Sequence, residues 1–150
     1  MKQAFYKSAI PVILILSFCV VSCKKDEAVS SSPVIKLLDV SSLNIKEFKD
    51  SLVIRFEYTD GDGDIGENDP DKYDLQVKDR RLSEADYYFV KPLAPPGSEI
   101  LIKGVISVQI KNTFLLGTGS NEVTQFDIKL RDRAGNWSNA INTPPITISR

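Results

Sequence analysis

Residues 51–60 read Ser-Leu-Val-Ile-Arg-Phe-Glu-Tyr-Thr-Asp, and their alternation of apolar and polar side chains indicates the fold class. Large apolar side chains occupy every second position: Leu52, Ile54, Phe56 and Tyr58. The residues between them include the charged Arg55 and Glu57. A period of two places the apolar side chains on one face of a β-strand and the polar ones on the other. The stretch therefore predicts a half-buried strand of an antiparallel sheet.

The same period recurs in residues 100–110 and 124–132, and weaker alternation marks four further segments. These are residues 34–40, 73–79, 87–91 and 141–149, the last interrupted by Pro144-Pro145. Gly104 interrupts the apolar face of residues 100–110, as a bulge or a close backbone approach does. Short strands between turns rich in Gly, Pro, Asn and Asp predict an all-β fold. We expect a single immunoglobulin-like or fibronectin-type antiparallel β-sandwich of about seven strands over residues 33–150, with a small barrel as the alternative.

The composition narrows the possible functions of this 150-residue chain. Its 19 Lys and Arg residues balance 20 Asp and Glu residues. The chain therefore lacks the basic excess that is typical of a nucleic-acid-binding protein. It has no histidine, and its two cysteines, Cys19 and Cys23, lie near the N-terminus. The predicted domain therefore lacks the residues of a histidine-based triad and a thiolate nucleophile. We expect a protein that is not an enzyme.

The N-terminus has the pattern of an export signal. Lys2 and Lys7 precede an apolar stretch, residues 9–21, which is too short to span a bilayer. Val20-Val21-Ser22-Cys23 resembles the lipobox of bacterial lipoproteins. The resemblance implies a signal peptide over residues 1–22, lipidation of Cys23 and attachment to a membrane. An ordinary secretory peptide is the alternative.

Residues 23–32 then form a predicted flexible tether that is rich in serine. Within it, Lys24-Lys25-Asp26-Glu27 is similar to the surface-export signal of Bacteroidota lipoproteins, although a plain solvated linker has the same composition. This resemblance implies a lipid-anchored protein on the outer face of the outer membrane.

The most unusual segment is an acidic loop, residues 60–71, with six carboxylates and no lysine or arginine. Glycines between the first aspartates let the backbone turn tightly, so that the carboxylates converge. Converging oxygen ligands favour Ca²⁺ over Mg²⁺, which demands a stricter octahedron. The candidate ligands are Asp60, Asp62, Asp64 and Asp69, with Asn68 or Asp71 completing the shell. The opening resembles an EF-hand loop but departs from it at Ile65, and a solvated acidic turn remains the alternative.

A second motif, residues 132–139, resembles the final hairpin turn of bacterial Ig-like domains. Gly135 and Asn136 can adopt positive φ there, and Asp132 can accept hydrogen bonds from neighbouring amides. Trp137, the only tryptophan, either folds back over the sheet edge or binds a glycan or protein partner.

These features together predict a surface lipoprotein that acts as a binding or accessory module and is stabilised by Ca²⁺. The alternative is a structural or assembly subunit of an outer-membrane complex that needs no metal.

Overall fold

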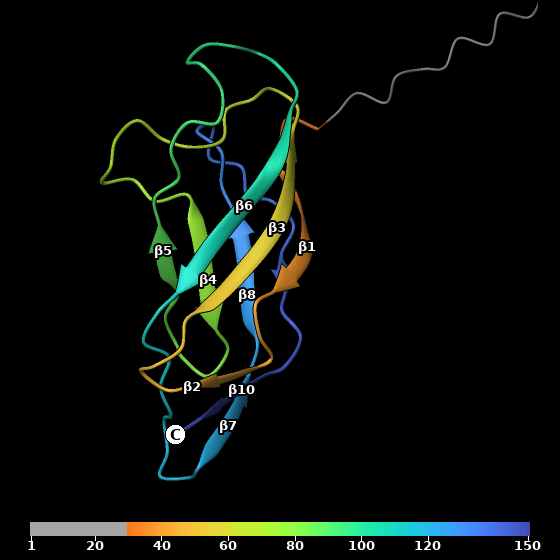
Figure 1. Ribbon diagram of the computed structural model, residues 1–150. Coiled ribbons are helices and arrows are strands. Elements are labelled where there is room, and N and C mark those ends of the chain that lie inside the picture. The colour runs from red at the N-terminus through yellow and green to blue at the C-terminus, as the bar shows by residue number, and fades with distance from the viewer. Residues whose placement is uncertain (1–29) are drawn as a thin grey trace, which may run out of the picture.

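The computed structural model describes residues 30–150, and these residues form strands and no helix (Figure 1). The strands are β1 (Val34–Val40), β2 (Asn44–Lys46), β3 (Leu52–Asp60), β4 (Leu75–Asp79), β5 (Asp86–Tyr88), β6 (Ile102–Ile110), β7 (Asn121–Thr124), β8 (Phe126–Leu130), β9 (Ile141–Asn142) and β10 (Ile146–Ser149). The all-β prediction is confirmed for this part of the chain. Within it, no helix is present that could cross a membrane. The predicted signal peptide, Cys23 and the tether up to residue 29 lie outside the described residues.

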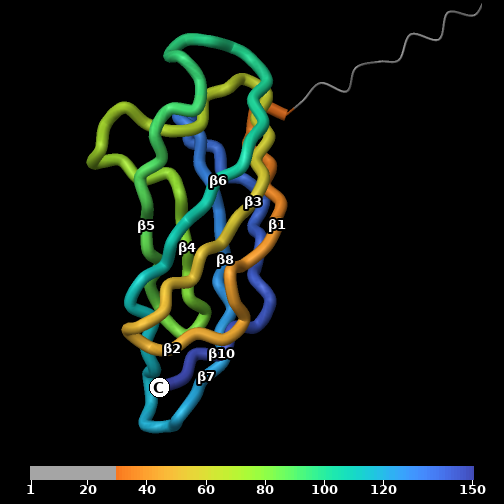
Figure 2. Tube along the Cα trace, in the orientation of Figure 1, coloured from red at the N-terminus to blue at the C-terminus, as the bar shows by residue number. Residues whose placement is uncertain are grey.

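The strands form three sheets arranged as two facing layers, consistent with a β-sandwich. One layer has the order β1-β3-β6, and the other has the order β5-β4-β8-β9. Figures 1 and 2 show β3 and β6 passing in front of β4 and β8. A small third sheet, β2-β10-β7, closes the end that holds the C-terminus. All pairings are antiparallel except that of β2 with β10.

The core lies between the two layers and follows the predicted period of two. Leu52, Ile54 and Phe56 of β3 are fully buried, and Ile128 and Leu130 of β8 are fully buried in the facing layer. Burying side chains of this size removes them from water and supplies most of the favourable free energy of folding.

β3 and β6 stay in register over nine residue pairs, so Gly104 does not mark a bulge. It marks the other predicted possibility, a close approach. A Cβ atom at Gly104 would lie 2.5 Å from the hydroxyl oxygen of Tyr58. The missing side chain makes room for the tyrosine ring inside the sandwich.

Several predicted strand boundaries change. β2 was not predicted, because a three-residue strand with one buried residue, Ile45, shows no period. Residues 141–149 form two strands, β9 and β10, because the proline pair cannot donate ladder hydrogen bonds. Residues 124–132 contain β8, and β7 ends just before it at Thr124. The strand predicted over residues 87–91 begins one residue earlier and ends at Tyr88, as β5. The strand predicted over residues 100–110 begins at Ile102, as β6, which leaves Ile100 and Leu101 in a loop.

Three loops gather at the end opposite the C-terminus (Figure 1). They are residues 61–74 after β3, residues 89–101 before β6 and residues 131–140 after β8. Ser30, where the described chain begins, lies at this same end, because its carbonyl accepts the backbone N–H of Gly61. We call it the loop end, and the candidate site lies within it.

Candidate metal site

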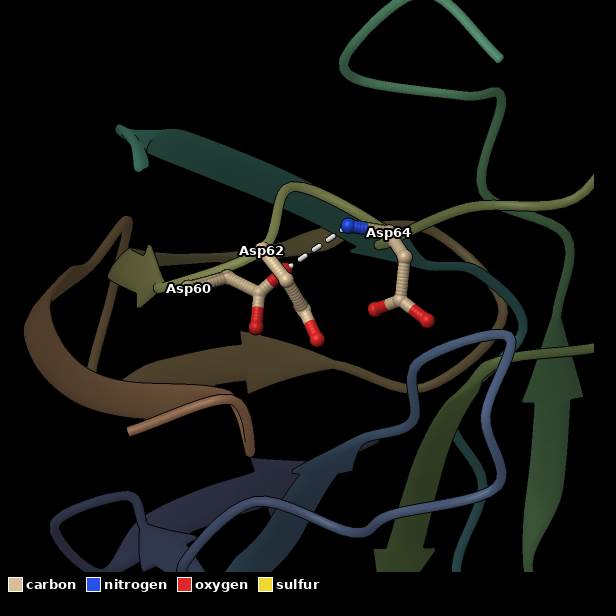
Figure 3. A group of neighbouring side chains, drawn as sticks. All are labelled: Asp60, Asp62 and Asp64. Carbon is tan, nitrogen blue, oxygen red and sulfur yellow. Dashed lines mark hydrogen bonds between the residues drawn. The ribbon is translucent and has the colours of Figure 1, made fainter. Parts of the chain in front are cut away.

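Three carboxylates converge where β3 leaves the sheet. Asp60 is the last residue of β3 and is fully buried, whereas Asp62 and Asp64 on the following loop are half-buried. One carboxylate oxygen from each residue lies within 4.8 Å of the other two (Figure 3). The structure thus brings together the first three predicted ligands.

Each of these side chains has a buried oxygen with no hydrogen-bond donor. The backbone N–H of Asp64 donates to Oδ2 of Asp60 at 3.0 Å, and the N–H of Ala134 donates to Oδ2 of Asp64 at 3.0 Å. Oδ1 of Asp60, of Asp62 and of Asp64 is buried and has no partner. A buried carboxylate oxygen without a donor costs several kcal/mol as a rule, unless a cation compensates it.

A second loop supplies a fourth negative charge, from Asp132. The two loops are joined by a bridge between Ile65 and Asp132 and by the backbone N–H of Arg133, which donates to the Asp64 carbonyl at 3.1 Å. Asp132 is buried, and both its oxygens accept hydrogen bonds from Asn136, at 2.6 and 2.9 Å. This confirms its predicted capping role.

Burial and the neighbouring charges raise the pKa of Asp60 and of Asp64. Burial raises the pKa of Asp60 to about 6; the amide of Asp64 counteracts this, and the charges of Asp62, Asp64 and Asp132 raise it further. Burial also raises the pKa of Asp64, as do the charges of Asp132 and Asp62, while the Ala134 amide and Arg133 lower it. These side chains repel one another when ionised, and a bound cation removes the repulsion.

Gly63 shapes the loop around the cluster. Its φ is +73°, a conformation that side chains rarely adopt, and a Cβ atom there would lie 2.6 Å from the carbonyl oxygen of Ile100. The prediction that glycine allows the tight turn therefore holds at Gly63. In the other motif, Gly135 has a φ of +91°, whereas Asn136 does not have the positive φ considered for it.

The other predicted ligands lie outside the cluster. Asn68, Asp69 and Asp71 are exposed, and Oδ1 of Asp69 accepts the backbone N–H of Asp71 at 3.1 Å. They form a turn of their own. The sequence interpretation missed Asp132 as part of the site, since nothing local links it to Asp60 before the fold is known.

Beside the cluster is a cavity of about 520 Å³. Its lining residues are Asp62, Asp64, Gly97, Ser98, Glu99 and Arg133. A cation held by the carboxylates would face this space and could bind water or a further oxygen ligand there.

Trp137 forms an isolated antiparallel bridge with Arg131, and 38% of its surface is exposed. The guanidinium carbon of Arg131 lies 5.4 Å from the ring centroid, close enough for a cation–π contact. Nη2 of Arg131 is also 3.5 Å from Oδ1 of the buried Asp74. Binding of a partner by Trp137 remains a prediction.

The chain matches no family model, no curated protein and no solved structure.

Proposed function

We propose that this chain is a lipid-anchored surface protein whose β-sandwich binds one Ca²⁺ through Asp60, Asp62 and Asp64. It works as a binding or accessory module and not as an enzyme. The observation that carries the proposal is the set of buried carboxylate oxygens, one on each aspartate, that have no hydrogen-bond donor.

Calcium suits this arrangement better than magnesium. Ca²⁺ binds six to eight oxygens at about 2.3–2.6 Å, so two oxygens on opposite sides of the ion are about 5 Å apart. All three carboxylates can therefore reach one ion with little movement, since their oxygens lie within 4.8 Å of one another. The neighbouring cavity leaves room for the additional ligands that Ca²⁺ requires.

The strand order supports an immunoglobulin-like sandwich. β1-β3-β6 follow the order of the A, B and E strands of such a fold, and β5-β4-β8-β9 follow the order of its C′, C, F and G strands. In this interpretation the loop end corresponds to one pole of the sandwich.

The anchor is supported by the lipobox-like Val20-Val21-Ser22-Cys23 and by the pattern that follows it. Two or more acyl chains hold a protein on a membrane stably. Mass spectrometry of the protein from membranes should show acyl chains on Cys23, with residues 1–22 removed. An unmodified cysteine would contradict the anchor.

Thermal unfolding of the mature chain tests the metal site. Calcium should raise the unfolding temperature above that measured in chelator, and magnesium at the same concentration should not. The calcium series extends to about 5 mM, because extracellular calcium sites are often weak. At 100 times its dissociation constant, calcium adds about 2.7 kcal/mol of stability. Asp62→Asn should abolish the shift, whereas Asp69→Asn, outside the cluster, should keep it. An unchanged shift in Asp62→Asn would place the calcium elsewhere.

A second candidate function, assembly with a larger envelope protein, is favoured by an aromatic pair at the opposite end. Phe48 is 68% exposed, has a φ of +56° and stacks on Phe114 with 6.2 Å between ring centroids. A strained, exposed aromatic residue is typical of a contact site. Phe48→Ala should remove a crosslinked partner on cells. Val123→Ala, which changes another exposed apolar side chain on β7, should retain that partner. Crosslinking unaffected by Phe48→Ala would dismiss this candidate.

A further inference from the structure

The loops of the candidate metal site are hydrogen-bonded to residues 30–35, the segment through which the chain enters the domain. The backbone N–H of Gly61, between two of the aspartates, donates to the carbonyl of Ser30 at 3.0 Å. On the other side, the Asn139 side chain exchanges two hydrogen bonds with the backbone of Ile35, each 2.9 Å. The entering chain is thus bonded to both loops that surround the cluster.

This connection limits how far the site can lie from an anchored membrane. Ser30 is seven residues beyond Cys23, and seven extended residues span at most about 25 Å. With Cys23 lipidated, the loop end is therefore the end of the domain nearest the lipid.

Two apolar side chains are exposed at this same end. Ile100 and Leu101 are 49% and 52% exposed, and the carbonyl of Ile100 packs against Gly63 of the acidic loop. Figure 1 shows their loop, residues 89–101, arching over the loop end. Exposed apolar side chains beside a lipid anchor are suited to the interfacial layer of a membrane.

The net negative charge of the loop end opposes contact with an anionic membrane, and a bound cation weakens this opposition. The acidic loop has six carboxylates, and Asp132 and Glu99 add to them, so the carboxylates outnumber the basic residues of the loop end, which are Lys72, Lys91, Arg131 and Arg133. A bound Ca²⁺ offsets two of these charges and faces the cavity, where its remaining ligand positions are open to oxygen atoms from outside the chain.

We propose that Ca²⁺ at this site docks the loop end onto a surface of anionic phospholipids. The ion joins Asp60, Asp62 and Asp64 to phosphate oxygens of lipid headgroups, while Ile100 and Leu101 enter the interfacial layer. This inference rests on the proposed metal site and anchor, and it adds the partner: the membrane itself.

Trp137 provides the readout, because it is the only tryptophan and lies on the loop after β8 at this end. The mature protein is extracted from membranes in detergent and reconstituted into vesicles of neutral lipid, or of neutral lipid with about 30% anionic phospholipid. Quenching of Trp137 by brominated lipid is compared with that in the same vesicles without bromine. Calcium should increase the quenching at least about twofold over chelator in anionic vesicles, and much less in neutral ones.

Two variants localise the contact. Ile100→Ser with Leu101→Ser should remove most of the calcium-dependent quenching. The matched control is Leu116→Ser with Val123→Ser, which changes similarly exposed side chains of the opposite end and should have no effect. Equal losses in both pairs would overturn the assignment of the contact.

The outcomes distinguish failure of the membrane docking from failure of the proposed metal site or of the lipid anchor. Thermal unfolding of the same preparation reports calcium binding directly. A calcium shift without increased quenching in anionic vesicles would overturn the docking and leave the metal site standing. No calcium shift would overturn both, and protein that carries no acyl chain would overturn the anchor on which the docking depends. Equal calcium-dependent quenching in neutral and anionic vesicles would overturn the preference for anionic headgroups.

Discussion

Replacing Asp60 by asparagine should stabilise the metal-free protein. The pKa of Asp60 is raised from 3.8 to about 6, so ionised Asp60 at pH 7.5 lowers the stability of the fold by about 3 kcal/mol. The asparagine side chain has no charge. Its carbonyl oxygen can still accept the N–H of Asp64, and its NH₂ group can donate to the neighbouring carboxylates.

In chelator the Asp60→Asn variant should therefore unfold at a temperature about 10 °C higher than the original protein, the shift that about 3 kcal/mol produces in a domain of this size. Calcium should reverse the order. The original protein gains about 2.7 kcal/mol at 100 times the dissociation constant and about 4.1 kcal/mol at 1,000 times, whereas the variant gains almost nothing.

Circular dichroism during thermal unfolding at pH 7.5, with chelator and across a calcium series, measures both effects. Asp69→Asn is the matched control, because Asp69 is exposed and lies outside the cluster. It should change stability by less than about 0.5 kcal/mol and keep the full calcium response. An Asp60→Asn variant that is less stable than the original protein in chelator, or that responds to calcium as the original does, would contradict this prediction.

Three further predictions concern pH, the loop and the anchor. In chelator, the free energy of unfolding should fall as pH rises from about 4 to about 6.5, because folded Asp60 keeps its proton up to about pH 6 while the unfolded chain releases it near 3.8. In saturating calcium the trend should reverse, since the metal needs ionised ligands. Parallel urea titrations at several pH values check both. Gly63→Ala should lower the unfolding temperature and weaken calcium binding more than Gly97→Ala does, since both have positive φ but only Gly63 lies against another backbone; similar losses would show that backbone strain alone accounts for the effect. Cys23→Ser should accumulate as an unprocessed precursor, and a variant that is processed and retained on membranes like the original, by cell fractionation, would contradict lipidation.

The strand pattern could be predicted from the sequence where alternation is strong. β3 and β8 have apolar side chains on every second residue, and both lie with that face in the core. β2 has a single buried residue and depends on pairing with β10, at the other end of the chain. Such a strand is determined by its partner and has no local signal.

The candidate site could be predicted only in part, for the same reason. Asp60, Asp62 and Asp64 converge because a tight turn acts over a few residues. Asp69 is near them in sequence, yet its segment turns back on itself. Asp132 joins the cluster only after the loop following β8 has packed beside the loop following β3. Half of the six candidate ligands predicted from spacing therefore lie in the cluster, and tertiary packing adds Asp132 beside them.

The position of the entering chain has a mechanical consequence. The anchor would pull on β1 from the loop end, while a partner bound at Phe48 would pull from the opposite end. Such tension runs parallel to the strands, so β1 would have to slide along β3 to detach. The six residue pairs that join the two strands would then bear the force together. The hydrogen bonds from Gly61 to Ser30 and between Asn139 and Ile35 lie where the load enters. A strand pulled in this direction resists in shear and is not peeled away one bond at a time.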